Sequence, residues 1–134
     1  MMVWEILQGL ENLNMKGYSI KFRDDEFMEY EELQEKVIEW AESKGIFEKS
    51  TPIKQIGKTQ EELLETFHAL IVYDLVSLKH KLDNVEDGIG DMLVTIIILA
   101  KMVGLDSVKC LDTAYNVIKN RKGKMVNGLF VKEE

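Results

Sequence analysis

The chain has 134 residues, of which 46% are hydrophobic, and it carries a formal net charge of −7. This length and composition predict one globular domain, residues 1–134, and exclude a disordered chain. The acidic balance argues against non-specific binding to nucleic acid, which requires a basic surface.

The single cysteine, Cys110, favours a reducing compartment, so we expect a cytoplasmic protein. Residues 1–10 lack the basic start of a signal peptide. We interpret residues 1–24 as an arm that packs on the body of the protein or on a second subunit. The longest apolar run, Met92–Ala100, has about half the length of a membrane-spanning helix. It therefore predicts a buried helix and no membrane partner.

A helical core is predicted over residues 29–121, followed by a tail at residues 122–134. Its first helix overlaps the acidic stretch Asp24–Glu35 and ends at Gly45, because glycine favours the left-handed conformation after a helix. The apolar face of this helix consists of Tyr30, Leu33, Val37, Trp40 and Ala41.

Thr51 and Pro52 predict the start of the second helix, with Thr51 as N-cap and Pro52 in the first turn. An alternative start lies at Thr59, where Thr59 and Glu62 have the spacing of a capping box. In that case Glu62 would be a capping residue and not a ligand. The residues that we expect this helix to bury are Ile53, Ile56, Leu63, Phe67 and Leu70.

A third helix is predicted to begin at Asp83–Glu86 and to continue through the buried stretch Met92–Val103 until Gly104. Asp106 is the predicted N-cap of a fourth helix. We expect Cys110 to be a small core residue of this helix. Its predicted apolar stripe is Val108, Leu111, Tyr115 and Ile118.

Two acidic turns stand out, at Glu61–Glu65 on the second helix and Glu86–Asp91 on the third. Spacings of three and four residues place their carboxylates on one helical face each. If the two faces meet, a carboxylate pair at about 4 Å repels by roughly 4 kcal/mol at an effective dielectric constant near 20. Such a cluster needs open water or a divalent cation, and hard oxygen ligands suit Mg²⁺ or Mn²⁺.

These turns resemble the signature of the MazG-like, all-α nucleoside triphosphate pyrophosphohydrolases. Glu62-Leu-Leu-Glu65 matches the first half of that signature, and Gly90-Asp91 with its apolar continuation matches the second. The acid that the family usually has three residues before this aspartate is Gly88 here, and Asp87 is the substitute on the same face. The resemblance implies an all-α, antiparallel bundle of about four main helices, completed by oligomerisation as a homodimer or homotetramer.

By the same resemblance, the reaction is the Mg²⁺-dependent hydrolysis of a nucleoside triphosphate to the monophosphate and pyrophosphate. Glu61, Glu62 and Glu65 are the catalytic candidates, with Glu61 as an outer ligand or as the group that deprotonates water. The metal ligands implied are Glu62, Glu65, Asp87 and Asp91.

The end of the fourth helix is basic. In an acidic chain, this end is the obvious place for a triphosphate, although dipole compensation alone also explains it. Trp40, Phe47 and Tyr115 are candidates to contact the base, whereas His68 is interpreted mainly as a core histidine. The substrate-binding candidates at the basic end are Asn116, Lys119, Arg121, Lys122 and Lys124.

Two other functions fit the sequence. The acids could be solvated on a non-catalytic helical adaptor that binds nucleotides or proteins. The chain could also be a narrower dUTP or dCTP hydrolase of the related all-α group.

Overall fold

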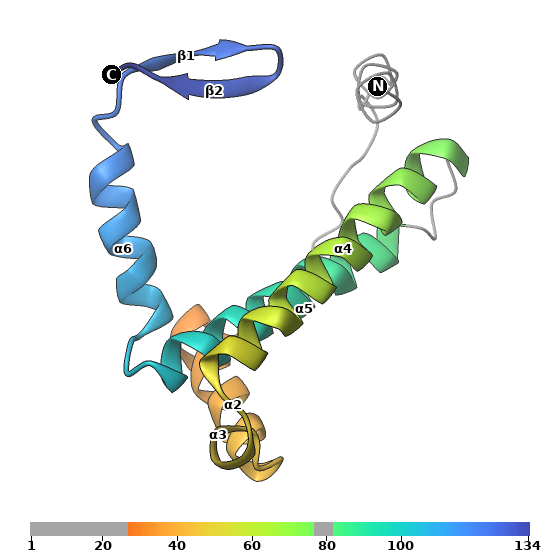
Figure 1. Cartoon of the computed structure of the whole chain (residues 1–134), viewed down its shortest axis with the longest axis vertical. Coiled ribbons are helices and arrows are strands. Elements are labelled where there is room, and N and C mark those ends of the chain that lie inside the picture. Colours follow the sequence, from red (N-terminus) through yellow and green to blue (C-terminus); the bar gives the residue numbers. More distant parts are fainter. Residues whose placement is uncertain (1–26, 77–81) are drawn as a thin grey trace.

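A computed structural model describes residues 27–76 and 82–134, which are mostly helical. The predicted arm at residues 1–24 and the basic residues 79–81 lie outside the described residues. The described part contains five helices and one two-stranded sheet (Figure 1). The elements are α2 (Tyr30–Ser43), α3 (Ile46–Lys49), α4 (Pro52–Val76), α5 (Leu82–Met102), α6 (Ser107–Ile118), β1 (Gly123–Val126) and β2 (Leu129–Lys132).

Helix α2 ends as the sequence predicts. Lys44 is its C-cap, and Gly45 follows with a φ of 73°, a left-handed conformation that glycine adopts without strain. The short helix α3 comes directly after this turn and was not predicted.

Helix α4 begins at Pro52, and the hydroxyl of Thr51 accepts a hydrogen bond from the Lys54 N–H at 3.3 Å. The predicted N-cap is therefore confirmed. The helix continues without a break past Thr59, whose hydroxyl donates to the Gln55 carbonyl within the same helix at 3.4 Å. The alternative start at Thr59 is thus wrong, and Glu62 is not a capping residue.

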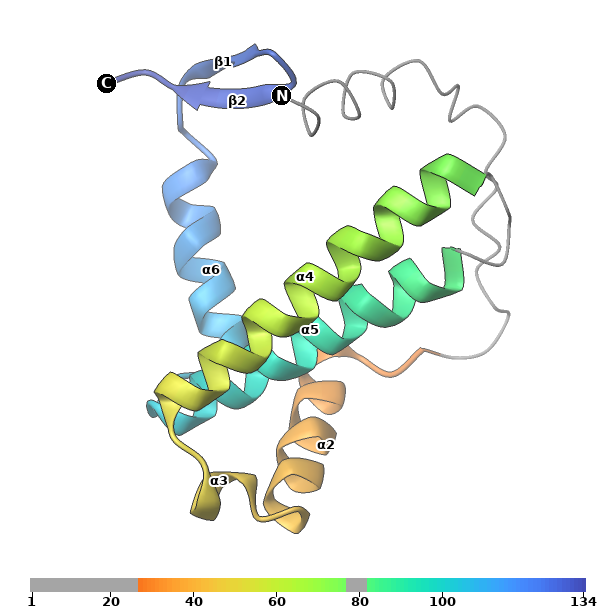
Figure 2. The same ribbon diagram turned by 45° about the vertical axis from the view of Figure 1, so that its right-hand side comes forward.

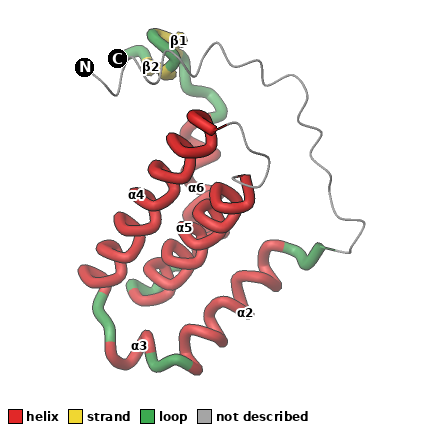
Figure 3. The backbone as a smooth tube through the Cα atoms, turned by 90° about the vertical axis from the view of Figure 1, so that its right-hand side faces the viewer, coloured by secondary structure: helices red, strands yellow, loops and turns green. Residues whose placement is uncertain are grey.

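Helix α5 is central to the fold. It lies antiparallel and side by side with α4 (Figures 1 and 2), and it lies between α4 and α2 (Figure 3). The buried apolar side chains come mainly from this helix, which explains why its sequence is the most continuously apolar in the chain. They are Val85, Ile97, Ile98 and Ala100, together with Ala41 of α2.

The apolar face predicted to be buried on α4 is exposed in the single chain. Leu63 has 56% of its surface exposed and Phe67 has 43%. The reason is the rotation of α4, which turns a polar face with Gln55 and Thr66 toward α5 and leaves the apolar face outside. The other exposed residues of this predicted face are Ile53, Ile56 and Leu70.

Helix α6 also differs from the prediction. Its N-cap is confirmed, since the Asp106 carboxylate accepts a hydrogen bond from the Lys109 N–H at 3.1 Å. Cys110, however, is exposed and not a core residue. Most of the predicted stripe is exposed as well, because α6 leaves the end of α5 and leads away from the α4–α5 pair (Figure 1). The exposed stripe residues are Leu111, Tyr115 and Ile118.

The predicted tail contains a β-hairpin. Strands β1 and β2 pair antiparallel, with Gly123 opposite Lys132 and Val126 opposite Leu129. Asn127 and Gly128 form the turn with φ angles of 50° and 78°, both in the left-handed region. Asn-Gly is the preferred sequence for such a two-residue turn, because these residues tolerate positive φ.

None of the described helices is by itself long and apolar enough to cross a membrane. Helices α5 and α6 have that length and composition only as a pair, and the pair is bent by 100°.

Helices α4 and α5 come close together at Gly88, which is buried. A Cβ atom at this position would lie 2.3 Å from the Thr66 Oγ1 and 3.3 Å from the Thr66 Cα. The second distance involves backbone, so a rotation of the threonine side chain alone does not relieve the contact. Gly90, two residues further on, has no such neighbour within 4 Å.

Replacement of these two glycines should therefore have opposite effects. Gly88→Ala should lower the free energy of unfolding by about 1–3 kcal/mol, the usual cost of overpacking. Gly90→Ala is the matched control and should raise it by about 0.5–1 kcal/mol, because alanine loses less backbone entropy in a helix. Urea denaturation followed by circular dichroism measures both. Equal effects would show that α4 and α5 are not in close contact at Gly88.

Candidate functional site

The predicted metal ligands lie along the contact between α4 and α5. We call Glu62, Glu65, Asp87 and Asp91 the acidic seam. Glu65, Asp87 and Asp91 line one cavity of about 390 Å³, which we call the acidic cavity. Its other lining residues are His68, Ala69, Val72, Asn84 and Gly88.

A second cavity of about 430 Å³ lies beside the seam. Glu62 and Asp91 contribute its acidic side, and Trp40 of α2 contributes an aromatic ring, so we call it the Trp40 cavity. Asp91 lines both cavities and so joins them. The remaining lining residues of the Trp40 cavity are Ile46, Ser50, Gln55, Lys58, Val94, Thr95 and Ile98.

The carboxylates of the seam are close enough to affect one another. Partial burial raises the pKa of the Glu62 carboxyl above its ordinary value of 4.5, and repulsion from Glu65 and Asp91 raises it further. The nearby ammonium of Lys58 opposes this rise. The seam is therefore a site where negative charge is disfavoured and where a cation would be stabilised.

Lys58 is one helical turn before Glu62 on α4. Its ammonium forms an ion pair with Glu61 at 3.0 Å. The hydrogen bond that Lys58 donates to the Glu61 carboxylate, and then the negative charges of Glu61, Glu62 and Glu65, raise the pKa of Lys58, so it remains a cation. Because Lys58 also lines the Trp40 cavity, it is the positive charge nearest to the seam on α4. Glu61 lines neither cavity.

Polar groups hold the two helices in register around the seam. The Gln55 amide of α4 is buried and donates to the Thr95 carbonyl of α5 at 3.1 Å. Three turns further along α4, the Thr66 hydroxyl donates to the Glu62 carbonyl at 2.7 Å and lies against Gly88 of α5. Glu62 therefore lies between two points where α4 is fixed against α5.

The contact between Thr66 and Gly88 also lies at the position where the sequence differs from the MazG-like signature that it resembles. A side chain at position 88 would collide with Thr66, so the acid that the family usually has there does not fit. Asp87 is exposed and lines the acidic cavity with Glu65 and Asp91.

The donor types of the seam fit Mg²⁺ or Mn²⁺, which prefer carboxylate oxygens. In the described residues, however, no three Asp, Glu, His or Cys side chains are grouped closely enough to hold a metal ion. Glu65, Asp87 and Asp91 are exposed, and exposed side chains change rotamer at little cost. Binding of a metal ion therefore requires these side chains to turn toward one another.

The predicted substrate-binding residues of the C-terminal region are not at the seam. Lys119, Arg121, Lys122 and Lys124 line neither cavity. The Asn116 amide is used within α6, where it donates to the Asp112 carbonyl at 3.0 Å and accepts from the Lys119 ammonium at 2.8 Å. In a single chain, these groups and the acidic seam are thus separate.

Two residues that line these cavities were not among the site residues predicted from the sequence. Lys58 was not predicted, although its spacing of four residues before Glu62 already placed it on the acidic face. His68 was interpreted mainly as a core histidine, but it is exposed and lines the acidic cavity. Its spacing of three residues after Glu65 was the signal for this position.

Comparison with known proteins assigns no family. No family model matches the chain, and no solved structure matches it. The chain is 37% identical over 78 residues to an "Uncharacterized 18.2 kDa protein in rep-hol intergenic region" of Haemophilus phage HP1 (strain HP1c1). The similarity covers 58% of this chain and 44% of the phage protein, so it spans less than half of that protein.

The charge of Glu62 should make the metal-free protein less stable. In EDTA, Glu62→Gln should raise the melting temperature near neutral pH, because the amide avoids the charge that burial, Glu65 and Asp91 disfavour. The folded state holds the Glu62 proton more tightly than the unfolded chain. Protonation thus stabilises the fold, and this contribution is lost as the pH rises through the raised pKa. The advantage of Glu62→Gln should therefore shrink as the pH falls toward 4.5.

Thermal denaturation at a series of pH values measures this difference. Glu48→Gln on α3 is the control, since Glu48 is exposed and lines neither cavity. It should show no comparable pH-dependent gain. A constant offset for Glu62→Gln at every pH would contradict the electrostatic interpretation.

Proposed function

We propose that this protein hydrolyses nucleoside triphosphates to the monophosphate and pyrophosphate with Mg²⁺ or Mn²⁺ as cofactor. The observation that carries the proposal is the position of Asp91, which lines both the acidic cavity and the Trp40 cavity. A triphosphate neutralised at the acidic seam would have its base next to an aromatic ring. This arrangement supports the function that the resemblance to MazG-like enzymes implies.

In this proposal, Glu62, Glu65, Asp87 and Asp91 hold the metal ion. When bound, the ion neutralises phosphate charge and makes a coordinated water more acidic. The chain itself contributes the raised pKa of Glu62, which reflects burial first and then repulsion from Glu65 and Asp91, and a cation would relieve that repulsion. The two fixed points on either side of Glu62 hold α4 and α5 together beside the proposed metal site.

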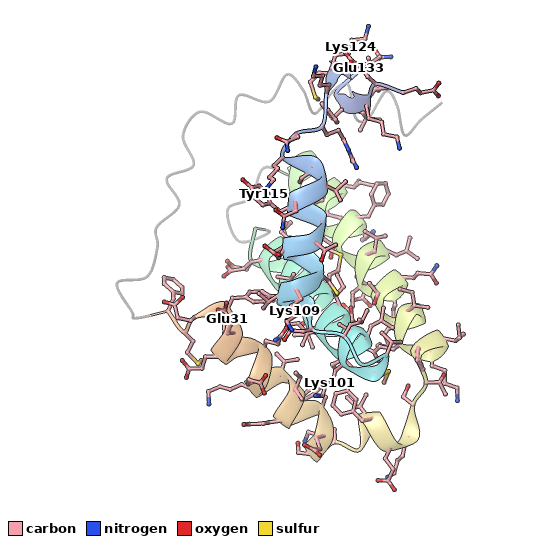
Figure 4. The ribbon with its side chains drawn as sticks, turned by 90° about the vertical axis from the view of Figure 1, so that its left-hand side faces the viewer. Glu31, Lys101, Lys109, Tyr115, Lys124 and Glu133 are labelled. Carbon is pink, nitrogen blue, oxygen red and sulfur yellow. The ribbon has the colours of Figure 1, made fainter. Side chains whose placement is uncertain are left out.

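The Trp40 cavity is the proposed site for the base. A tryptophan ring offers a flat apolar surface on which a base stacks, worth about 1–3 kcal/mol in single-stranded nucleic acid complexes. Of the three aromatic candidates, Trp40 lines this cavity. Phe47 lines a different cavity with Pro52 and Lys101, and Tyr115 lies on α6 (Figure 4).

Positive charge for the phosphates is available from Lys58 at the boundary of the Trp40 cavity. A lysine acts on phosphate as a point charge. Glu61 forms an ion pair with Lys58 and is the residue that the sequence predicts to orient and deprotonate water. His68 in the acidic cavity is a second candidate for the group that accepts a proton from the attacking water.

The exposed apolar surface of α4 and α6 supports the expected homodimer or homotetramer. Monomeric proteins rarely expose continuous apolar patches of this kind, because burying them stabilises the assembly. Neither nucleic acid nor a membrane is an expected partner.

A second candidate function is a non-catalytic helical adaptor. It is favoured by the separation of the carboxylates, since no three of them are grouped as metal ligands in the described part of the chain. Calorimetric titration with Mg²⁺ separates the two functions, because dispersed acids would bind no stoichiometric ion. A panel of nucleotides, dUTP and dCTP included, assayed for pyrophosphate release decides between a broad and a narrow hydrolase.

Loss of one acid from the seam should abolish activity. Glu65→Gln and Asp91→Asn should each reduce Mg²⁺-dependent pyrophosphate release at least about a hundredfold, the upper range for residues that merely support metal ligands. Circular dichroism should show unchanged helical content. Glu39→Gln on the exposed surface of α2 is the control and should retain wild-type turnover. Full activity in either seam variant would refute the ligand assignment.

Lys58 should contribute more to substrate binding than to the rate of the chemical step. Lys58→Gln should raise the KM several-fold and lower kcat less, because the charge contacts phosphates in the ground state as well as in the transition state. Lys54→Gln, one turn earlier on α4 and exposed, is the matched control for loss of a lysine. An unchanged KM in Lys58→Gln would place Lys58 outside the binding site.

A further inference from the structure

The wall of the Trp40 cavity between α4 and α5 carries buried polar side chains. Gln55 of α4 and Thr95 of α5 both line this cavity, and only 5% and 7% of their surfaces are exposed. The cavity has a volume of about 430 Å³, which is in the range of small-molecule pockets. A buried polar wall selects ligands, because a ligand that does not complete its hydrogen bonds leaves these groups unsatisfied.

A hydrogen bond to the backbone fixes the direction in which the Gln55 amide points. Its nitrogen donates to the Thr95 carbonyl at 3.1 Å. In the reversed orientation the amide oxygen would lie against that carbonyl oxygen, and two acceptors without a proton between them repel each other. The carbonyl belongs to the backbone of helix α5, so it does not rotate away. The Gln55 amide therefore has one orientation, which the packing of α4 on α5 determines.

This orientation leaves the Gln55 oxygen as an acceptor toward the cavity. No described residue donates a hydrogen bond to this oxygen, yet the described residues contain no buried side-chain oxygen or nitrogen that lacks a partner. The oxygen is therefore open to the cavity that Gln55 lines. The amide also keeps a second N–H, since a glutamine nitrogen carries two hydrogens.

Thr95 adds no donor to this wall. Its hydroxyl donates to a backbone carbonyl of its own helix at 2.8 Å, and a hydroxyl has only one proton. Of the other polar groups, the Ser50 hydroxyl both donates and accepts, and the ionised carboxylates of Glu62 and Asp91 only accept. Lys58 is the proposed contact for the phosphates. Acceptors therefore predominate among the groups that are left for a base.

The nucleobases differ in what they present to such a wall. Adenine and cytosine carry an exocyclic amino group, which donates, beside a ring nitrogen without a proton, which accepts. Guanine, thymine and uracil have an exocyclic oxygen in the equivalent place. A glutamine amide pairs with adenine by accepting from the amino group and donating to the ring nitrogen. An exocyclic oxygen opposite the Gln55 oxygen would leave both acceptors without a hydrogen.

We propose that the Trp40 cavity selects adenine and cytosine over guanine, thymine and uracil, and that Gln55 determines this preference. The base stacks on Trp40, and its amino group donates to the Gln55 oxygen. The Thr95 carbonyl keeps the amide from reversing. The inference rests on the proposed function in taking a nucleotide as the ligand, but binding of the base is measurable without hydrolysis.

Pairs of nucleosides test the selection in the absence of metal. Deoxycytidine and deoxyuridine differ in having an amino group or an oxygen at this edge, and deoxyadenosine and deoxyinosine differ in the same way. In ligand-observed NMR titrations of the metal-free full-length protein, the amino member of each pair should bind about tenfold more tightly, because the other member leaves a hydrogen bond unmade. Equal dissociation constants within either pair, or binding of no nucleoside, would overturn the proposal.

Gln55→Met keeps the length of the side chain and removes its hydrogen-bonding groups, so the preference within each pair should disappear. The matched control is Gln60→Met on the exposed surface of α4, which lines neither cavity and should keep the full preference. Circular dichroism shows whether both variants are folded. A preference that survives in folded Gln55→Met would contradict the role of Gln55. If that variant does not fold, the nucleoside pairs still decide with the wild-type protein.

Trp40→Leu tests whether the base lies in this cavity. Stacking on an aromatic ring tolerates every base, so this variant should weaken the binding of all four nucleosides by a similar factor, at least about fivefold. The preference within each pair should remain, because Gln55 is unchanged. Unaltered binding in Trp40→Leu would place the base outside the Trp40 cavity and overturn the proposal.

Pyrophosphate release separates the selection of the base from the proposed function. With Mg²⁺, dATP and dCTP should have a higher kcat/KM than dITP and dUTP. Equal values within each pair would overturn the selection and leave the hydrolase. Selection among the nucleosides by a protein that releases no pyrophosphate from any of the four nucleotides would instead refute the proposed function and leave the base site.

Discussion

The contact between Thr66 on α4 and Gly88 on α5 is the constraint on which the rest of the structure depends. It brings two long helices together at a point where a Cβ atom would lie 2.3 Å from the threonine hydroxyl. The acids of the seam flank this contact on both helices. Burial, and then repulsion from Glu65 on the same helix and from Asp91 on α5, raise the pKa of Glu62, and the packing in turn limits where carboxylates fit.

The α4–α5 pair inverts the usual arrangement of an amphipathic helix. Gln55 and Thr66 of α4 are buried against α5, whereas Leu63 and Phe67 of the same helix are exposed. Burying polar groups is costly unless they are hydrogen-bonded, and both of these side chains are bonded. In the described residues, α4 therefore turns polar side chains toward α5 and leaves its apolar face exposed.

Much of the local structure could be predicted from the sequence. Thr51, Gly45 and Asp106 were predicted as helix boundaries and are confirmed, because capping depends on neighbouring residues only. Helix α3 and the hairpin were missed. The Asn127-Gly128 turn was a clear hairpin signal, but β1 and β2 are short and mostly exposed, so no buried alternation marked them as strands.

The sequence by itself determined which helix carries each acid of the seam. It also determined that the acids of each helix share one face, because side chains three and four residues apart lie on the same side of a helix. Only the tertiary structure decided that Gly88 excludes an acid, that Asp91 joins two cavities and that Lys119–Lys124 lie away from the seam. These facts depend on how α4 is rotated against α5 and on the bend before α6. A periodic pattern shows that a helix has an apolar face, but the partner of that face is set by contacts between residues distant in the sequence.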